Sequence, residues 1–297
     1  MEHYSLLVET GADLPADLAQ RFDVYQVPMH VSFGAETRDD GTIPIQQLFS
    51  YYQKTGTLPQ TSGCTPGDFA KAFDEIHSKY PERHIIHLAY SAATTCSYQS
   101  AIIAAEGRDY VTSIDTMHVS AGQMLVTLAT ARYIQTHPAC TPEQITQAVA
   151  QIRSCCRMAF FPGDLAYLKA GGRVSNAAYL GAKILSLNPL IEINGGLLQA
   201  TKKYRGTMQK IAPKLLHDYT AAKNLDKRLL TFVYSEGLDD ALKAALTADA
   251  KQLGFETILW VRTGCVVSTH SGPGAFGICG FTENEALHSI LLADSPS

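Results

Sequence analysis

The side chains best suited to chemistry lie near the end of the chain, around His270. Two β-branched residues, Val266 and Val267, lead into the segment 268–277, which contains His270 and three glycines. A β-branched run before a glycine-rich turn predicts a strand that ends at the turn, so we expect His270 at a strand end. Gly272 would let the backbone approach a ligand closely. Such a histidine either binds a ligand or is a hydrogen-bonded structural residue, and this segment alone is compatible with both.

Hydroxyl-bearing side chains form a second group of candidates. Thr61 and Ser62 lie in a loop just before Thr65-Pro66, a pair of residues that typically begins a helix. Helix N-termini offer free backbone N–H groups that can bind anions. Because Thr-Pro begins helices in proteins of every function, a purely structural role is the alternative.

A further hydroxyl-rich turn follows the strand predicted over 84–90. It contains Ser91, Thr94 and Thr95 and leads into an apolar helix. The first strand, predicted over 5–8, likewise ends in a polar turn before a helix. In open α/β sheets, ligands bind outside the carboxyl ends of the strands, so these turns are expected near a binding site.

Positive charge is concentrated in two places of the second half. A helix predicted over 164–169 ends at Gly171-Gly172, a typical C-cap, and Arg173 follows directly. An Asn-Gly pair then joins two apolar segments into a hairpin over 189–199. A basic cluster precedes the next helix and consists of Lys202, Lys203 and Arg205. Its simplest interpretation is a solvated turn.

The order of predicted elements indicates two domains. Strands and helices alternate with short turns in the first half, which predicts a mostly parallel α/β sheet covered by helices. The second half mixes helices, a hairpin and strands, which predicts an α+β domain. We place the boundary loosely near residue 155, giving domains 1–155 and 156–297 with a cleft between them.

Composition excludes several classes of protein. The chain has 297 residues and a net charge of −4, so no large basic surface for nucleic acid is expected. No signal peptide is recognisable, and the apolar stretches are shorter than the ~20 residues of a membrane span. The seven cysteines show no C-x-x-C spacing. We therefore expect no metal site, and scattered reduced thiols are typical of a cytoplasmic protein.

Common catalytic motifs are also missing from the sequence. It contains no P-loop, no G-x-G-x-x-G after a strand, and no G-x-S-x-G elbow. This gives no support to nucleotide-driven or hydrolytic chemistry.

Several segments together resemble the DegV family of bacterial proteins. Each segment is weak alone, but their order and spacing match over essentially the whole chain. The matching segments are 8–13, 59–62, 91–101, 114–116, 168–175, 180–189, 203–205 and 270–275.

The resemblance implies a protein that holds one long-chain fatty acid between two domains and uses no cofactor. It implies that the carboxylate is bound by hydroxyls, an arginine and a histidine, which correspond to Thr61, Ser62, Ser91, Thr94, Thr95, Arg173, His270 and the backbone at Gly272. Burying a tail of roughly sixteen carbons releases on the order of 10 kcal/mol before the costs of binding. A partly buried carboxylate must be hydrogen-bonded, or it takes up a proton.

The same resemblance implies a partner and a pathway. A separate ATP-dependent fatty acid kinase would phosphorylate the bound carboxylate, and the acyl phosphate would enter phospholipid synthesis. The basic cluster 202–205 would then contact an acidic surface of that kinase. The protein itself would be a lipid-binding subunit rather than an enzyme, and the resemblance also allows transient contact with a membrane.

Four positions depart from the family pattern. Glu9 replaces an aspartate, Ala92 lacks a hydroxyl that the family often directs at the carboxylate, Cys96 replaces a glycine, and Asn188 replaces a lysine. A different head group preference or a different ligand is therefore an open alternative.

Two other functions remain open from the sequence. The protein could be a stand-alone enzyme in which His270 acts as general base on an acyl or phosphorylated substrate. It could also bind small apolar metabolites through a site that has lost its preference for carboxylates at Ala92.

Overall fold

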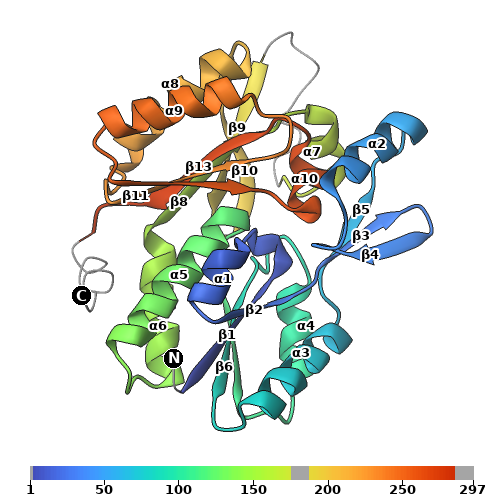
Figure 1. Ribbon diagram of the computed structural model, residues 1–297, viewed down its shortest axis with the longest axis vertical. Helices are drawn as coiled ribbons and strands as arrows, with labels where there is room; N and C mark the ends of the chain where they lie inside the picture. Colours follow the sequence, from blue (N-terminus) through green and yellow to red (C-terminus); the bar gives the residue numbers. More distant parts are fainter. Residues whose placement is uncertain (1–2, 175–186, 285–297) are drawn as a thin grey trace.

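The computed structural model describes residues 3–174 and 187–284. The sequence also predicts a helix over 179–185 with Ser175 as its cap, and this segment lies outside the described residues. The described chain forms three sheets with helices packed around them (Figure 1).

The first sheet is parallel and four-stranded. It contains β1 (Tyr4–Glu9), β2 (Val24–Val27), β6 (His84–Ala89) and β7 (Val111–Asp115), in the order β2-β1-β6-β7. Alternate residues of β1 face opposite sides, as the two-residue period of a strand requires. Leu6 and Val8 join the core formed with α5 (Ser120–Thr136) and α6 (Pro142–Cys155), whereas Leu7 packs with Phe69 and Phe73 of α3 (Pro66–Lys79).

Two further helices complete the cover of this sheet. The helix α1 (Ala16–Arg21) follows the short 3-10 turn η1 (Thr10–Ala12), and α4 (Ser97–Ala105) lies beside α3 (Figure 1). The pairs Thr65-Pro66 and Thr141-Pro142 both predict a helix start from the sequence. Thr65 and Thr141 indeed cap α3 and α6 through capping boxes, and both helices begin with proline.

The second sheet has six strands from the second half of the chain. They are β8 (Cys156–Phe161), β9 (Leu187–Asn194), β10 (Leu197–Arg205), β11 (Leu229–Tyr234), β12 (Thr257–Arg262) and β13 (Phe276–Phe281). Their order is β10-β9-β8-β13-β11-β12, and only β11 and β12 are parallel to each other.

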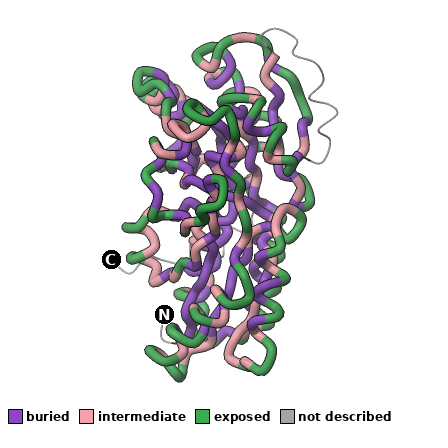
Figure 2. The backbone as a smooth tube through the Cα atoms, turned by 90° about the vertical axis from the view of Figure 1, so that its right-hand side faces the viewer, coloured by how far each residue is buried: buried purple, intermediate pink, exposed green. Residues whose placement is uncertain are grey.

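Each face of the six-stranded sheet has its own cover. The helices α8 (Met208–Lys223) and α9 (Asp240–Gln252) cover one face, where Leu215 and Leu246 are fully buried. The other face packs toward α5, so Met158 and Val233 share a core with the helices of the first sheet. Figure 2 shows buried residues running through the interior of both sheets and exposed residues at the loops.

The third sheet was not predicted from the sequence. The strands β3 (His30–Phe33), β4 (Glu36–Asp39) and β5 (Gln60–Ser62) pair antiparallel in the order β4-β3-β5. With α2 (Ile45–Thr55) they form an arm that projects from the body of the molecule (Figure 1). The stretch 24–33, predicted as one extended segment, is divided at Pro28 because β2 and β3 belong to different sheets. Thr61 and Ser62, expected in a loop, lie on β5.

The prediction of a strand leading to His270 is wrong. Residues Cys265–Ser271 form a short helix, α10, that is followed by Gly272. Backbone N–H groups in its first turn donate to carboxylates of residues far away in sequence, and burial of Cys265 and Val266 adds apolar contacts. These tertiary contacts outweigh the preference of Val266 and Val267 for strands.

The basic cluster also differs from its prediction. Residues 202–205 are not in a turn but on β10, at the edge of the six-stranded sheet. The hairpin itself is confirmed, with Asn194 paired to Leu197 at its tip.

The predicted fold class is confirmed, because a parallel α/β sheet from the first half accompanies a mixed sheet from the second. α6 ends at Cys155 and β8 begins at Cys156, which agrees with the loosely placed boundary. The division into domains 1–155 and 156–297 stays a prediction.

Candidate functional site

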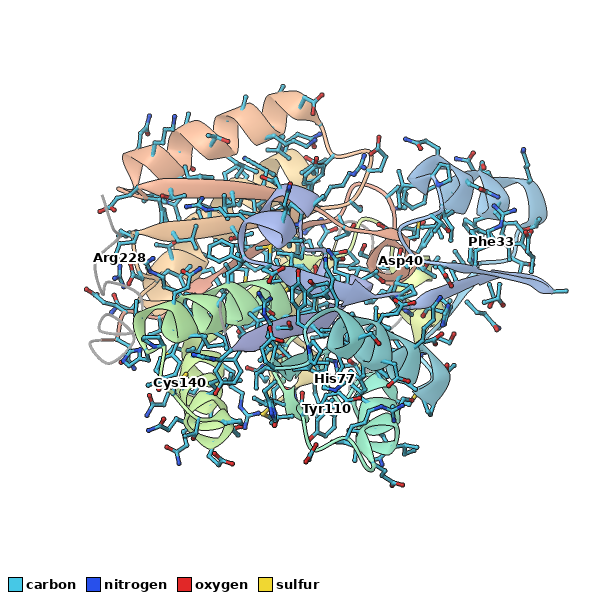
Figure 3. All side chains as sticks on the ribbon, turned by 60° about the horizontal axis from the view of Figure 1, so that its bottom comes forward. Phe33, Asp40, His77, Tyr110, Cys140 and Arg228 are labelled. Atoms are coloured by element: carbon cyan, nitrogen blue, oxygen red, sulfur yellow. The ribbon has the colours of Figure 1, made fainter. Side chains whose placement is uncertain are left out.

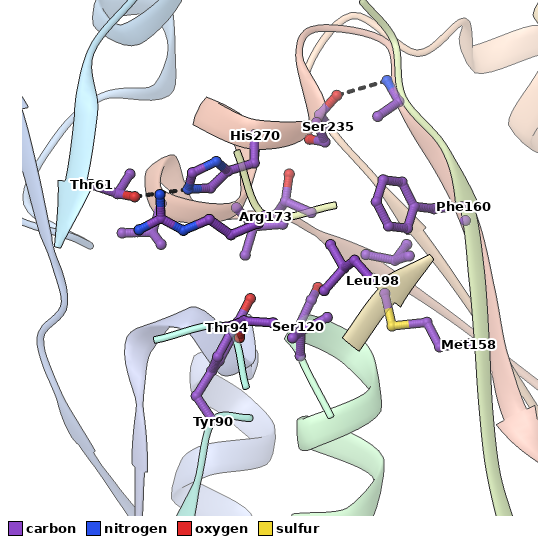
Figure 4. Close-up of a pocket in the computed structure, with 18 of the residues that line it drawn as sticks. Thr61, Tyr90, Thr94, Ser120, Met158, Phe160, Arg173, Leu198, Ser235 and His270 are labelled. Atoms are coloured by element: carbon purple, nitrogen blue, oxygen red, sulfur yellow. Dashed lines mark hydrogen bonds between the residues drawn. The ribbon is translucent and has the colours of Figure 1, made fainter. Parts of the chain in front are cut away.

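One cavity lies between the first sheet, the six-stranded sheet and the arm. About 800 Å³ there is not filled by protein atoms when open solvent is included, and the centre of a water-sized sphere can occupy about 80 Å³. Figure 4 shows that its two sides differ: Thr61, Arg173 and His270 lie on one side, and Met158, Phe160 and Leu198 on the other. We call these the polar end and the apolar end of the cavity.

A hydrogen bond between two distant segments defines the polar end. Thr61 Oγ1 of β5 and His270 Nε2 of α10 lie 2.8 Å apart (Figure 4). Burial lowers the pKa of His270 to about 4, and the nearby positive charge of Arg173 contributes. His270 is therefore neutral at neutral pH.

Arg173 reaches the polar end from a helix terminus. The helix α7 (Leu165–Gly171) ends at Gly172, which has a φ of 62° in the left-handed region. Arg173 then donates one Nη1 hydrogen bond to the carbonyl of Gly171, at 2.8 Å. Among residues 3–174 and 187–284, no carboxylate forms an ion pair with Arg173. Its charge is available to an anion in the cavity.

Close packing of a glycine holds the His270 ring. A Cβ atom added to Gly171 would lie only 2.2 Å from His270 Nδ1. Real Cβ atoms do not approach other atoms so closely, so this position requires glycine while the ring stays in place. In the sequence Gly171-Gly172-Arg173, Gly171 packs against His270 and Gly172 ends the helix. Arg173 supplies a positive charge.

The remaining wall of the polar end comes from the end of β5 with the turn that follows it, and from the hydroxyl-rich turn after β6. Ser62, Thr94 and Thr95, which the resemblance assigns to carboxylate binding, line the cavity. The Thr94 hydroxyl donates to the carbonyl of Ser91 at 3.0 Å, which fixes the turn. A Cβ added to Gly63 would lie 2.4 Å from Thr95 Oγ1, so this glycine allows the two turns to meet.

Two predicted residues do not line the cavity. The Ser91 hydroxyl is fully buried and donates to the carbonyl of Gly196 at 2.6 Å, where it joins the β6–α4 turn to the β9–β10 hairpin. Gly272 ends α10, and its carbonyl accepts a hydrogen bond from Ser235. Both therefore support the wall of the cavity from behind.

The four departures from the family pattern also lie away from the cavity wall. Ala92 and Cys96 are exposed, and Asn188 donates to the carbonyl of Gly206 at 2.8 Å. Glu9 is fully buried beneath the cavity and accepts hydrogen bonds from the backbone of Tyr90 and from Gln123, at 2.9 and 2.7 Å. Burial alone would raise the pKa of Glu9, but these bonds and the charge of His87 hold it below its usual value.

The predicted partner-binding residues lie elsewhere. Lys202 forms an ion pair with Asp218 at 3.3 Å, and its ammonium lies over the ring of Tyr204. Lys203 and Arg205 are exposed on the same edge strand. None of the three lines the cavity.

The apolar end was missed by sequence reasoning. Its side chains include Val119, Met158, Phe160, Leu198, Val233 and Phe276. Val119 directly precedes α5, the others come from four strands that are far apart in sequence, and each looks like an ordinary core residue in its own segment. The alternation of Met158 and Phe160 on β8 is the one local signal that they share a face.

The described residues contain neither a metal cluster nor a membrane-spanning helix. Within the part of the chain that the structure describes, no group of three or more His, Cys, Asp or Glu side chains could hold a metal ion. No helix of that part is long and apolar enough to cross a membrane.

Comparison with known proteins identifies the family. A family model described as an uncharacterised protein of the DegV family matches residues 4–283. Because this match covers nearly the whole chain, the protein belongs to the DegV family. The resemblance inferred from the sequence is confirmed.

Individual relatives cover the same length. Protein DegV of Bacillus subtilis is 25% identical over 278 residues, which are 93% of this chain and 98% of that protein. A DegV family protein from Thermus thermophilus, whose structure is described by its fatty acid binding, is 27% identical with a TM-score of 0.84 and covers 95% of this chain and 100% of its own. A stearic-acid-binding protein from Eubacterium ventriosum shares the fold at 21% identity, with a TM-score of 0.80 and coverage of 94% and 98%.

Proposed function

We propose that this protein binds one long-chain fatty acid in the cavity, with the carboxylate at the polar end and the tail at the apolar end. The main support for this proposal is that one end of the cavity carries a cation and hydroxyl groups, whereas the other end is apolar. This arrangement matches a ligand that is itself divided into a charged head and a hydrocarbon tail.

The polar end can donate hydrogen bonds to a carboxylate, so that the carboxylate stays ionised and takes up no proton. Arg173 supplies a charge-assisted donor, and the Thr61 hydroxyl adds a neutral one. A bound carboxylate would also raise the pKa of His270 from its value of about 4, because opposite charges stabilise each other at short range. His270 thus becomes a better donor when the ligand is present.

The apolar end can bury the tail. Met158 is flexible and polarisable and can adjust to a chain of variable shape. Each methylene that leaves water contributes about 0.8 kcal/mol before the costs of association. The descriptions of the relatives from Thermus thermophilus and Eubacterium ventriosum as fatty-acid-binding proteins support the same ligand class.

We further propose that the protein presents the carboxylate to a separate ATP-dependent kinase. Arg173 is exposed, so the polar end is the side of the cavity that a second protein can reach. The basic residues of β10 lie on an edge strand, where an acidic partner surface could dock. In this account the protein carries the substrate and performs no step of the phosphoryl transfer.

The test compares ligands that differ only in the head group. Palmitic acid and hexadecanol are titrated into the delipidated protein, into Arg173→Gln, and into a control, Arg262→Gln, whose arginine pairs with Glu236 outside the cavity. We expect Arg173→Gln to weaken acid binding about tenfold or more, as for loss of a charge-assisted hydrogen bond, and to leave alcohol binding nearly unchanged. Equal binding of acid and alcohol by the unmodified protein would contradict the proposed head group site.

The Thr61–His270 hydrogen bond favours one alternative function. A hydroxyl at 2.8 Å from a neutral imidazole resembles a nucleophile beside its general base, as in acyl-transfer enzymes. This alternative predicts hydrolysis of an acyl ester by the purified protein alone, lost in both Thr61→Val and His270→Ala. The binding proposal predicts no turnover under the same conditions.

A further inference from the structure

Two carboxyl groups lie behind the cavity wall, at the opposite end of α10 from His270. Asp13 Oδ1 accepts a hydrogen bond from the backbone N–H of Gly264 at 2.7 Å. Asp40 Oδ1 accepts from those of Cys265 and Val266 at 3.0 and 3.4 Å. Both aspartates are buried. Figure 3 places Asp40 where the arm joins the body, whereas Phe33 lies further out on the arm.

These contacts replace a cap that the helix lacks. The N-cap residue of α10 is Gly264, which has no side chain to accept from the first turn. Orphan N–H groups at a helix N-terminus need acceptors, and negative charge there is favourable. The acceptors come from residues 251 and 225 positions away in the chain.

The aspartates are themselves anchored to other parts of the fold. Asp13 follows η1 with a φ of 52° and accepts a hydrogen bond from Ser120, the first residue of α5. The backbone N–H of Asp40 donates to the carbonyl of Met29 at 2.7 Å. The pair therefore connects the first sheet, the arm and α5 to the helix that carries His270.

The two carboxyl groups are close enough to affect each other. A Cβ added to Gly264 would lie 3.3 Å from Asp13 Oδ1 and from both carboxylate oxygens of Asp40. Burial, with a smaller contribution from the charge of Asp40, raises the pKa of Asp13 to about 8, although the hydrogen bonds from Gly264 and Ser120 lower it. Burial raises the pKa of Asp40 as well. Like charges at this distance disfavour double ionisation, so Asp13 keeps its proton at neutral pH.

Other ionisable groups around the pair do not change this conclusion. Tyr90, on the turn after β6, is close to both aspartates, and burial raises the pKa of its hydroxyl, so it stays neutral. Burial also raises the pKa of Cys265 on α10, to about 12. Glu9 of β1 has a lowered pKa, accepts hydrogen bonds through Oε2 and lies 3.4 Å from His87 Nε2 through Oε1. The positive charge of Arg173 lowers the pKa of Tyr90, and that of Arg262 lowers the pKa of Cys265, but burial has the larger effect on both.

We propose that Asp13 and Asp40 are positioning residues for His270, acting as a pair through the N-terminal amides of α10. A helix of seven residues is about 10 Å long and behaves as a short rigid rod. Fixing its first turn therefore fixes His270 against Thr61, together with Val266 and Val267 of the cavity wall. While Asp13 keeps its proton the pair holds the helix, and loss of that proton loosens it.

The test follows the His270 ring without any ligand. The Cε1–H resonance of His270, assigned with His270→Gln, is recorded between about pH 6 and 10, where the imidazole itself does not titrate. We expect a shift with a midpoint near pH 8 in the unmodified protein and none in Asp13→Asn. Asp40→Asn removes the neighbouring charge and should lower the midpoint by about one pH unit or more. The control Asp17→Asn, an exposed aspartate on α1, should behave like the unmodified protein.

Ligand binding supplies a second readout, and this readout rests on the proposed function. Affinity for palmitic acid should fall with the same midpoint in the unmodified protein, and Asp13→Asn should remove that fall. The inference is overturned if the His270 resonance does not change between about pH 6 and 10, or changes identically in Asp13→Asn. If the unmodified protein binds no fatty acid, the proposed function fails while the resonance still decides the role of the pair.

Discussion

At the scale of single residues, the polar end depends on how closely Gly171 approaches His270. We expect Gly171→Ala to displace the His270 ring, because the added Cβ would lie 2.2 Å from Nδ1. The hydrogen bond to Thr61 should then be lost, and fatty acid affinity should fall about tenfold, as for loss of a hydrogen-bonding group at a buried site. The measurement is a binding titration alongside far-UV circular dichroism.

A matched glycine provides the control. Gly67 lies in the first turn of α3, where an added Cβ would meet only Thr65 Oγ1, at an ordinary 3.6 Å. Gly67→Ala should leave affinity unchanged. Undiminished affinity in a folded Gly171→Ala variant would show that the ring position does not matter for binding.

Sequence reasoning was informative about some residues of the cavity and not about others. Thr61, Arg173 and His270 could be proposed because their side chains can bind an anion, and the resemblance to the DegV family then assigned them to a carboxylate. Ser91 was also proposed, but its hydroxyl is used by the carbonyl of Gly196. A local pattern indicates which side chains can bind an anion, but it does not reveal which of them a distant backbone group already occupies.

At the scale of secondary structure, local sequence patterns fail to predict the helix α10 and the arm. Val266 and Val267 favour a strand, yet α10 forms because Asp13 and Asp40 accept its first amides from more than 200 residues away. The three-stranded arm was likewise missed, since its strands have only 3 or 4 residues each. Helices with their own caps, such as α3 and α6, were predicted correctly at their first turns.

The cap of α3 carries a prediction at this scale. Thr65 accepts from the backbone of Asp68, whose side chain accepts from the backbone of Thr65. We expect Thr65→Ala to lower the free energy of unfolding by about 1 kcal/mol, as for loss of an N-cap. Urea denaturation would measure the change. The exposed Thr55→Ala should change stability by less than about 0.5 kcal/mol, and an equal effect of both variants would argue against the capping role.

At the scale of the whole molecule, the buried acids predict how stability depends on pH. The pKa of Asp13 is about 8 in the folded protein and near 3.8 when unfolded, so the folded state binds the proton more tightly. Its contribution to stability is present below the unfolded pKa and is lost as pH rises through the folded one. Stability should therefore decline between about pH 4 and 8 through this group.

Asp13→Asn isolates that contribution, because the amide cannot titrate. Its free energy of unfolding should vary less over the same pH range than that of the unmodified protein. Glu9, whose pKa is lowered, acts in the opposite sense and loses its contribution only as pH falls through the acid range. Parallel curves for the variant and the unmodified protein, from thermal or urea unfolding, would contradict the assignment to Asp13.

The cavity itself is a property of the whole molecule. Its wall combines β5 of the arm, α10, the end of α7 and four strands of the six-stranded sheet. No single segment contains both ends of the cavity, so only the resemblance to a family could suggest it from the sequence. The apolar end in particular forms only when β8, β10, β11 and β13 come together in one folded sheet.

The central claim is that this cavity holds a fatty acid by its carboxylate. The most direct measurement is mass spectrometry of the organic extract from freshly purified protein, with Arg173→Ala and His270→Ala prepared in parallel. We expect close to one long-chain acid per protein molecule in the unmodified protein, and much less bound acid in both variants. A folded, unmodified protein that carries no fatty acid and binds none on addition would contradict it.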